Sequence, residues 1–227
     1  MDPLAPYNLP NNRPVSMVIP RGPGDICARD GSGGAWRATW LDRSLIGIAA
    51  SDERDLLDNR RSMVWSGSFA ESRGGGLFDE DPRTWGRAGW TELESACHRL
   101  SITNAQVLVR PHFRHVISDV PSCRRLLESE WARALGIGLA FDPAAMCAPS
   151  MLGPGRIEDH LRRMYEAIEM LPRCEDGDLA GIATVIIGIP GTDGVPTRAA
   201  DNESLGSFVL DLAKSHIPPG LPTLVPA

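Results

Sequence analysis

Lysine is almost absent from this chain of 227 residues: Lys214 is the only one, and arginine supplies nearly all of the 23 basic side chains. One interpretation is forked recognition of phosphate or carboxylate groups, for which a guanidinium is better suited than an ammonium. The alternative, which we favour, is a GC-rich genome that biases codon choice toward arginine. The scarcity of lysine therefore does not by itself indicate a ligand.

Positive charge is also in the minority. The 23 basic side chains face 29 acidic ones, which gives a formal net charge of −6 and a pI near 5.4. Affinity for nucleic acid comes mostly from neutralising phosphates, so no nucleic-acid partner is expected. A hydrophobic content of 42% and a charged content of 23% are typical of a globular protein. They exclude a disordered, a collagen-like and a coiled-coil chain.

Paired cysteines and long apolar segments are missing as well. The five cysteines are widely spread and show no CxxC spacing, which argues against a disulfide framework and against a zinc site. The first residues lack the basic and apolar regions of a signal peptide. No apolar run approaches the roughly 18 residues that cross a bilayer. We expect a cytoplasmic protein with no membrane partner.

Short apolar runs bounded by Gly, Pro, Asp or Ser predict strands along most of the chain. Residues 1–14 are rich in Pro and Asn and predict an extended arm, followed by one domain over residues 15–227. The predicted strands are Ser16–Ile19, Ala35–Trp40, Ser44–Ala49, Ser62–Ser66, Gln106–Arg110, Ile137–Phe141, Ala183–Ile189 and Pro222–Val225.

The helices between these strands are marked by capping residues and apolar stripes. The capping box Thr91–Glu94 predicts a helix start, and Pro121 suits a first helical turn. Ile157–Leu171 carries the longest amphipathic stripe, and Asn202 is a candidate cap for another helix. Residues 52–60 form a weaker helix candidate.

Strands that alternate with helices of 10–15 residues indicate βαβ units and a parallel sheet. The number of units predicts a (β/α)₈ TIM-like barrel with abbreviated early units. A doubly wound open sheet is the competing architecture. Because no GxGxxG follows the first strand, a dinucleotide-binding fold is less favoured, and the barrel is preferred.

Side-chain alternation predicts where polar groups of two strands point. In residues 106–115 and 136–146, the large apolar residues share one face and should pack on the helices. Arg110, His112 and Asp142 then point into the barrel. Because active sites of such barrels lie at the carboxyl ends of the strands, we expect these three side chains to converge there. His115 should lie in the following loop, at the mouth of the pocket.

Arg110 and Asp142 should pair directly, because a buried unpaired charge is very costly. One hypothesis is that Arg110 takes the electrostatic role of a cation and holds an anionic or polyhydroxylated ligand together with His112. The other hypothesis is a satisfied ion pair that closes an inactive barrel mouth.

The segments LVRPHF and GLAFDPAAM resemble the later half of the xylose isomerase-like barrels. That superfamily includes sugar-phosphate isomerases and epimerases and the endonuclease IV type of nuclease. The resemblance covers about Leu93 to Leu171. It implies one strand that ends in Glu-Asn-His and a next one that ends in Asp-x-x-His, whose side chains bind a divalent metal beside a sugar.

This sequence departs from that pattern at most ligand positions. Arg110 stands in place of the glutamate, Ala145 in place of the second histidine, and the last two strands lack their histidine and glutamate. Only His112 and Asp142 remain as weak candidate ligands. Two ligands beside a guanidinium do not form a tight six-coordinate site. The sequence therefore favours a pocket without cofactor over one that holds Mn²⁺, Zn²⁺ or Mg²⁺.

The leading functional prediction is a divergent sugar-phosphate isomerase- or epimerase-like barrel protein. It would bind a small carbohydrate-like or phosphorylated ligand through Arg110, His115 and Trp65. If it is active, His112 and Asp142 would be its catalytic residues. The alternative is a catalytically silent barrel that binds a ligand or a protein. A nuclease is disfavoured by the acidic charge. Assembly into a homo-oligomer is compatible with the sequence.

Three further features have a functional and a structural interpretation. The glycine clusters at residues 31–34 and Gly74–Gly76 lack the Lys-Ser/Thr of a P-loop and favour flexible turns, although the second could cover the pocket. Trp65 could stack on a sugar ring, but core packing is the preferred interpretation. Glu71 could act as an acid or base, while a solvated loop position is preferred for it.

Overall fold

The computed structural model describes residues 17–19, 24–29, 35–57, 61–100, 107–153, 155–174, 181–191, 195–197 and 199–226. The predicted arm over residues 1–14 and the first glycine cluster lie outside these ranges. The strands are β1 (Met17–Ile19), β2 (Gly24–Arg29), β3 (Ala35–Ser44), β4 (Ser62–Trp65), β5 (Val107–Arg110), β6 (Ile137–Phe141), β7 (Ile182–Ile186) and β8 (Thr223–Pro226).

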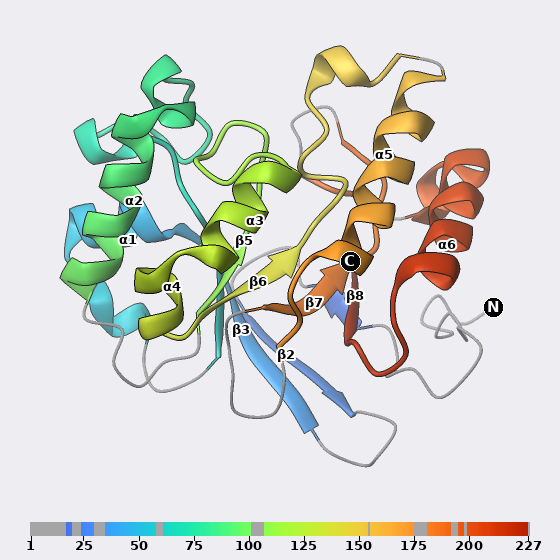
Figure 1. Ribbon diagram of the computed structural model, residues 1–227, viewed down its shortest axis with the longest axis horizontal. Coiled ribbons are helices and arrows are strands. Elements are labelled where there is room, and N and C mark those ends of the chain that lie inside the picture. The colour runs from blue at the N-terminus through green and yellow to red at the C-terminus, as the bar shows by residue number, and fades with distance from the viewer. Residues whose placement is uncertain are drawn as a thin grey trace.

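These strands form one curved sheet in the order β1-β8-β7-β6-β5-β4-β3-β2. Strands β3 to β8 run parallel, and each is connected to its neighbour by a segment that contains a helix. The helices lie in an arc along the outer face of the sheet (Figure 1). They are α1 (Leu45–Ser51), α2 (Arg87–Leu100), α3 (Val120–Glu128), α4 (Glu130–Ala134), α5 (Arg156–Ala167) and α6 (Glu203–His216).

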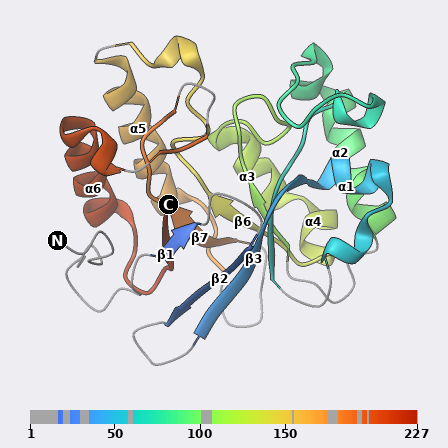
Figure 2. The ribbon, with the colours of Figure 1, turned by 180° about the vertical axis from the view of Figure 1, so that it is seen from behind.

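The predicted closed (β/α)₈ barrel is wrong, because the sheet is open. A barrel closes only when its two edge strands pair with each other. Among the described strands, β1 pairs with β8 and β2 pairs with β3, so β1 and β2 are the two edges of the sheet. Figure 2 shows both edge strands from behind. Six parallel strands, β3 to β8, thus form a half-barrel with one added strand at each edge.

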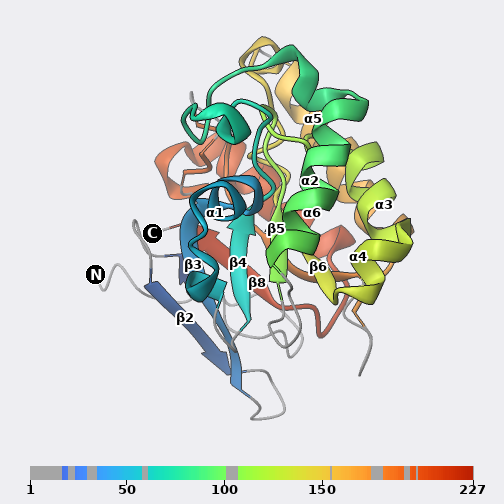
Figure 3. The same cartoon turned by 90° about the vertical axis from the view of Figure 1, so that its left-hand side faces the viewer.

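The reason for this departure lies in the first units of the chain. Strands β2 and β3 pair antiparallel from Gly24↔Trp40 to Arg29↔Ala35, so this unit is a hairpin without a crossover helix. An antiparallel pair needs only a short turn, whereas a parallel pair needs a longer crossover. The β2–β3 ribbon projects away from the helical layer (Figure 3). Sequence reasoning missed β2 altogether.

A second correction concerns residues 44–49, which were predicted as a strand and form the start of α1. Strand β3 continues to Ser44, whose hydroxyl then caps the helix by accepting a hydrogen bond from the backbone N–H of Gly47 at 2.9 Å. Short apolar runs do not distinguish strand from helix by periodicity alone. The serine cap decided the outcome here, because it satisfies an N–H that the first helical turn leaves unpaired.

Helix boundaries follow the predicted caps in part. Asn202 accepts a hydrogen bond from Leu205 N and caps α6, as expected. Helix α2 begins at Arg87, so the predicted start at Thr91 is wrong. Of residues 52–60, only Arg54–Leu57 form a short 3-10 turn (η1) in the described part. None of the described helices is both long enough and apolar enough to cross a membrane.

The two faces of the sheet have different partners. The outer face packs on the helices through residues such as Val109, Leu139 and Phe141. The inner face carries a separate apolar cluster, which we call the interior cluster. Its buried members are Trp40, Met63, Trp65, Leu108, Ala140, Ala145, Ala183, Ile186 and Leu224. The alternation predicted for β5 and β6 is therefore confirmed.

We predict that Gly89→Ala destabilises the protein although alanine is the better helix former. A Cβ at Gly89 would lie 2.0 Å from the carbonyl oxygen of Thr84, so the backbone would have to move. We expect a loss of about 1–3 kcal/mol, measured by urea unfolding. As a control, Gly153→Ala meets only the Arg156 side chain at 3.8 Å and should change stability by less than about 0.5 kcal/mol. Equal effects of both substitutions would contradict this packing.

Candidate functional site

Three polar or aromatic side chains meet at the carboxyl ends of β4, β5 and β6. Trp65 ends β4 and lies opposite Arg110, which ends β5. Asp142 directly follows β6. Because parallel strands end at the same edge of the sheet, these residues are brought side by side from positions far apart in the chain. The predicted convergence of Arg110 and Asp142 is confirmed.

Arg110 and Asp142 form a buried ion pair, as the sequence predicted. Asp142 Oδ2 accepts hydrogen bonds from Nε and Nη2 of Arg110, each at 2.6 Å, and Oδ1 accepts one from the backbone N–H of Ala145 at 3.1 Å. The residues are only 2% and 0% exposed. Burial lowers the pKa of Arg110 and raises the pKa of Asp142, and the direct contact between them opposes both shifts. The direct contact thus offsets part of the cost of burying both groups.

Two indole rings enclose the guanidinium of Arg110. Its Cζ lies 4.7 Å from the ring centroid of Trp40 and 4.0 Å from that of Trp65. Cation–π contacts of this kind are strongest where water is excluded. Trp40 was not singled out in the sequence. Strand pairing brings it to this site: Trp40 pairs with Met63, which lies two residues before Trp65 and therefore on the same face of the sheet.

His112 and His115 lie in the loop after β5 and contact each other, with ring centroids 4.8 Å apart. An extended chain would aim these side chains in different directions. Instead the loop turns, and His115 N donates to His112 O at 2.9 Å. Both residues are 0% exposed, so His115 is buried and does not lie at an open mouth. His112 Nδ1 accepts a hydrogen bond from Arg114 N at 3.1 Å.

Residues 74–81, which we call the cover segment, lie over the histidines. The Phe78 ring stacks on His115, with centroids 5.4 Å apart and ring planes 3° apart, and it also contacts Trp65. His115 Nε2 lies 2.8 Å from the carbonyl oxygen of Leu77, and Arg114 contacts both the Phe78 carbonyl and the Glu80 carboxylate. The segment begins with the glycine cluster and is attached to the β5 loop by these contacts.

The tautomer of His115 follows from its contact with Leu77. A carbonyl oxygen can only accept, so Nε2 carries the proton and Nδ1 of the neutral ring is an acceptor. Burial lowers the pKa of His115 well below its usual range, and nearby His112 and Arg110 act in the same direction. His115 is therefore neutral in the folded protein at ordinary pH.

Besides Arg114 Nε, which lies 3.0 Å from the Glu80 carboxylate, two buried polar atoms of the described part of this cluster lack a hydrogen-bond partner. They are Nε1 of Trp65, a donor, and Nδ1 of His115, an acceptor, and their rings are 5.6 Å apart. Asp142 contacts Nε and Nη2 of Arg110, so the third guanidinium nitrogen, Nη1 of Arg110, lies outside this ion pair. Buried polar atoms without partners are rare in proteins and call for a bound water, ion or ligand.

No metal centre is evident in the part of the chain that the structure describes, where no group of three or more His, Cys, Asp or Glu side chains is arranged to hold an ion. His112 and Asp142 were the candidate ligands. The Asp142 carboxylate is bound to Arg110 instead, which places a positive charge where a cation would have to sit. That no cofactor is bound stays a prediction.

Glu71 is buried and does not lie in a solvated loop, as had been preferred. Its carboxylate accepts hydrogen bonds from Ser44 Oγ at 2.7 Å and from Ser68 N at 2.9 Å. A Cβ at Gly47 would lie 2.6 Å from Glu71 Oε1, so the glycine makes room for the carboxylate. Burial is the main cause that raises the pKa of Glu71 to about 7. Glu71 thus joins the turn that precedes the cover segment to the cap of α1.

Comparison with known proteins identifies no relative: no family model, curated protein or solved structure matches this chain.

We predict that Arg110→Met destabilises the protein by about 3–5 kcal/mol, because it leaves the Asp142 carboxylate buried and unpaired. The double variant Arg110→Met with Asp142→Asn should be more stable than Arg110→Met alone, since it removes the stranded charge. Urea unfolding of the two single variants and the double variant measures this coupling. Additive losses would show that the two side chains do not depend on each other.

The pH dependence of stability should change in Glu71→Gln. Because the pKa of Glu71 is raised from 4.5 to about 7, the folded state binds the proton more tightly than the unfolded state between these values. The contribution of Glu71 to the free energy of unfolding is therefore greatest below pH 4.5, and it falls by about 3 kcal/mol as the pH rises to 7. Unfolding free energies of both proteins across this range should show the fall only in the wild type. Parallel curves would contradict the shift.

Proposed function

We propose that the protein binds a small, polyhydroxylated molecule, either neutral or monoanionic, inside the half-barrel beside the Arg110–Asp142 pair, and that it is not an isomerase. The observation that carries this proposal is the pair of buried, unpartnered atoms, Trp65 Nε1 and His115 Nδ1. They lie beside the Arg110–Asp142 pair, whose carboxylate is bound on both oxygens. A bound ligand would satisfy them.

The chemistry of the ligand follows from the chemistry of these atoms. The Trp65 N–H requires an acceptor, such as a carboxylate or hydroxyl oxygen, and Arg110 Nη1, which Asp142 does not contact, would donate to the same ligand. His115 Nδ1 requires a donor, such as a hydroxyl. A sugar alcohol or a hydroxy acid offers both. Because Asp142 already neutralises Arg110, the buried pair carries no net charge, and a dianion would be costly to desolvate there.

Catalysis of isomerisation is less well supported than binding. Both carboxylate oxygens of Asp142 accept hydrogen bonds, and His112 Nδ1 accepts one from Arg114 N. Neither the Asp142 carboxylate nor His112 Nδ1 is therefore free to act as a base. The xylose isomerase-like resemblance implied a closed barrel, whereas this sheet is open. We keep from it only the class of ligand.

Access to the site would require the cover segment to move. Trp65 and His115 are 1% and 0% exposed, and Leu77 and Phe78 pack against the interior cluster. Gly74 adopts a positive φ of 83° at the start of this segment, which glycine tolerates better than other residues. Movement of residues 74–81 about this glycine would expose the histidines without disturbing the sheet.

Ligand binding is tested by calorimetric titration with xylitol, gluconate and glucose 6-phosphate, which are neutral, monoanionic and dianionic. We expect xylitol or gluconate to bind and glucose 6-phosphate not to bind at this site. Trp65→Phe keeps the ring but removes the N–H, so it should weaken binding about fivefold. Trp131→Phe is the control, because Trp131 packs on the helical side of the sheet.

Two results would overturn the proposal. One is the absence of binding by both xylitol and gluconate, together with a high-resolution crystal structure that shows only water at Trp65 Nε1 and His115 Nδ1. The other is turnover of a sugar phosphate that His115→Gln abolishes, which would replace binding by catalysis.

A further inference from the structure

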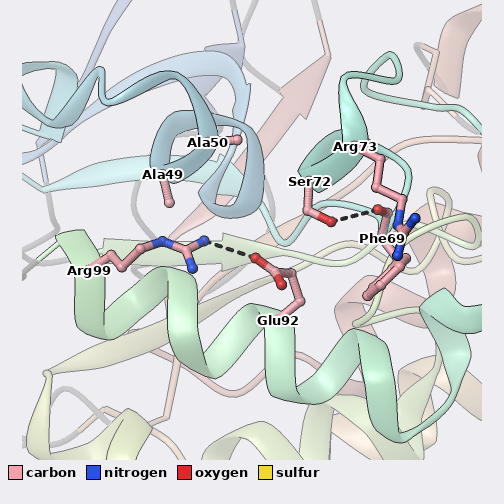
Figure 4. A pocket seen from close by; sticks show the side chains of 7 residues that line it. All are labelled: Ala49, Ala50, Phe69, Ser72, Arg73, Glu92 and Arg99. Atoms are coloured by element: carbon pink, nitrogen blue, oxygen red, sulfur yellow. Dashed lines mark hydrogen bonds and ion pairs between the residues drawn. The ribbon is translucent and has the colours of Figure 1, made fainter.

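A groove on the outer side of the molecule lies apart from the interior cluster. It runs between α1, the 3-10 turn η2 (Glu71–Arg73) and α2, and its volume is about 550 Å³. Figure 4 shows the lining side chains, with α2 along one wall. Grooves of about 300–1,000 Å³ suit small organic molecules. The residues that line it are Ala49, Ala50, Phe69, Ser72, Arg73, Glu92 and Arg99.

The charge in this groove is opposite to that of the whole chain. Two arginines, Arg73 and Arg99, share the groove with one carboxylate, Glu92, which leaves one positive charge in a protein of net charge −6. Glu92 and Arg99 are two turns apart on α2, and Arg99 Nη2 contacts Glu92 Oε1 at 2.9 Å. This contact engages only one of the guanidinium nitrogens of Arg99.

Arg73 differs from the neighbouring arginines in its partners. Among the described residues, no carboxylate lies within ion-pair distance of Arg73, whereas Arg83 pairs with Asp81. Arg73 and Arg83 both lie over the Phe69 ring, with Cζ 5.3 Å and 4.5 Å from its centroid. Phe69 is itself fixed, because its backbone N–H donates to Thr84 Oγ1 at 3.0 Å. The guanidinium is thus held at the groove with its donors available.

We propose that this groove binds an organic phosphate monoester. Guanidinium groups recognise phosphate with parallel hydrogen bonds, and Arg73 and Arg99 would supply them from two walls of the groove. Ala49 and Ala50 provide an apolar surface for the organic part of the ligand, since the Phe69 ring is already covered by Arg73 and Arg83. The Glu92 carboxylate repels the anion, and ligand binding would break its contact with Arg99, whose guanidinium would then bind the phosphate. This site is independent of the ligand proposed for the interior.

Phenyl phosphate is the probe, and its binding is measured by calorimetric titration at low salt. Arg73→Gln should weaken binding about tenfold, the effect of losing a charge-assisted contact of roughly 1.4 kcal/mol. Glu92→Gln should strengthen binding, because it removes the competing carboxylate. Arg163→Gln removes the same charge from an exposed position on α5 and is the matched control, with no change expected.

Specificity for the phosphate group is tested with benzoate and phenol, which share the ring. We expect binding of both to be weaker than that of phenyl phosphate, and we expect added salt to weaken phenyl phosphate binding. The proposal is overturned if phenyl phosphate shows no saturable binding, if Arg73→Gln and Arg163→Gln have equal affinities, or if benzoate binds as tightly. A loss of affinity in Glu92→Gln would also overturn it, because the carboxylate would then contribute to binding.

Discussion

A charged guanidinium in a protein interior is tolerated only when a partner compensates it, and the Arg110–Asp142 pair meets this condition inside the curved sheet. The carboxylate is fixed by the turn that follows β6, through Ala145 N. The guanidinium is enclosed by Trp40 and Trp65 from two other strands. The guanidinium of Arg110 therefore links four strands, β3 to β6, through one ion pair and two cation–π contacts, and these contacts require the carboxyl ends of the strands to stay in register.

The same constraint shapes the loops above the sheet. The neighbouring histidines are buried as well, and burial lowers the pKa of His115 well below its usual range. The cover segment completes the enclosure through Phe78, and Glu71 attaches the turn that precedes this segment to the cap of α1. The Phe78 ring thus packs over Trp65 and His115, and each of these two residues keeps one polar atom without a hydrogen-bond partner. A site of this construction is suited to binding a small polar molecule more than to exchanging protons with it.

The two proposed ligands differ because their surroundings differ. Inside the half-barrel the arginine is neutralised and dry, which favours a molecule with little charge. In the outer groove the arginines are exposed and in excess over carboxylates, which favours an anion. The two proposals thus give arginine two different uses, as a neutralised, buried group inside the half-barrel and as an exposed cation in the outer groove.

Local pattern alone determined the strands β4 to β8, the cap at Asn202 and the alternation that turns Arg110 and Asp142 inward, because these depend on neighbouring residues and on the period of a strand. The pairing of Arg110 with Asp142 followed from the cost of a lone buried charge. Only the tertiary structure decided that the sheet stays open, since closure depends on how two distant edges meet. It also decided the burial of Glu71 and the contact between the histidines and Phe78, because loops that pack across long separations leave no periodic signal in the sequence.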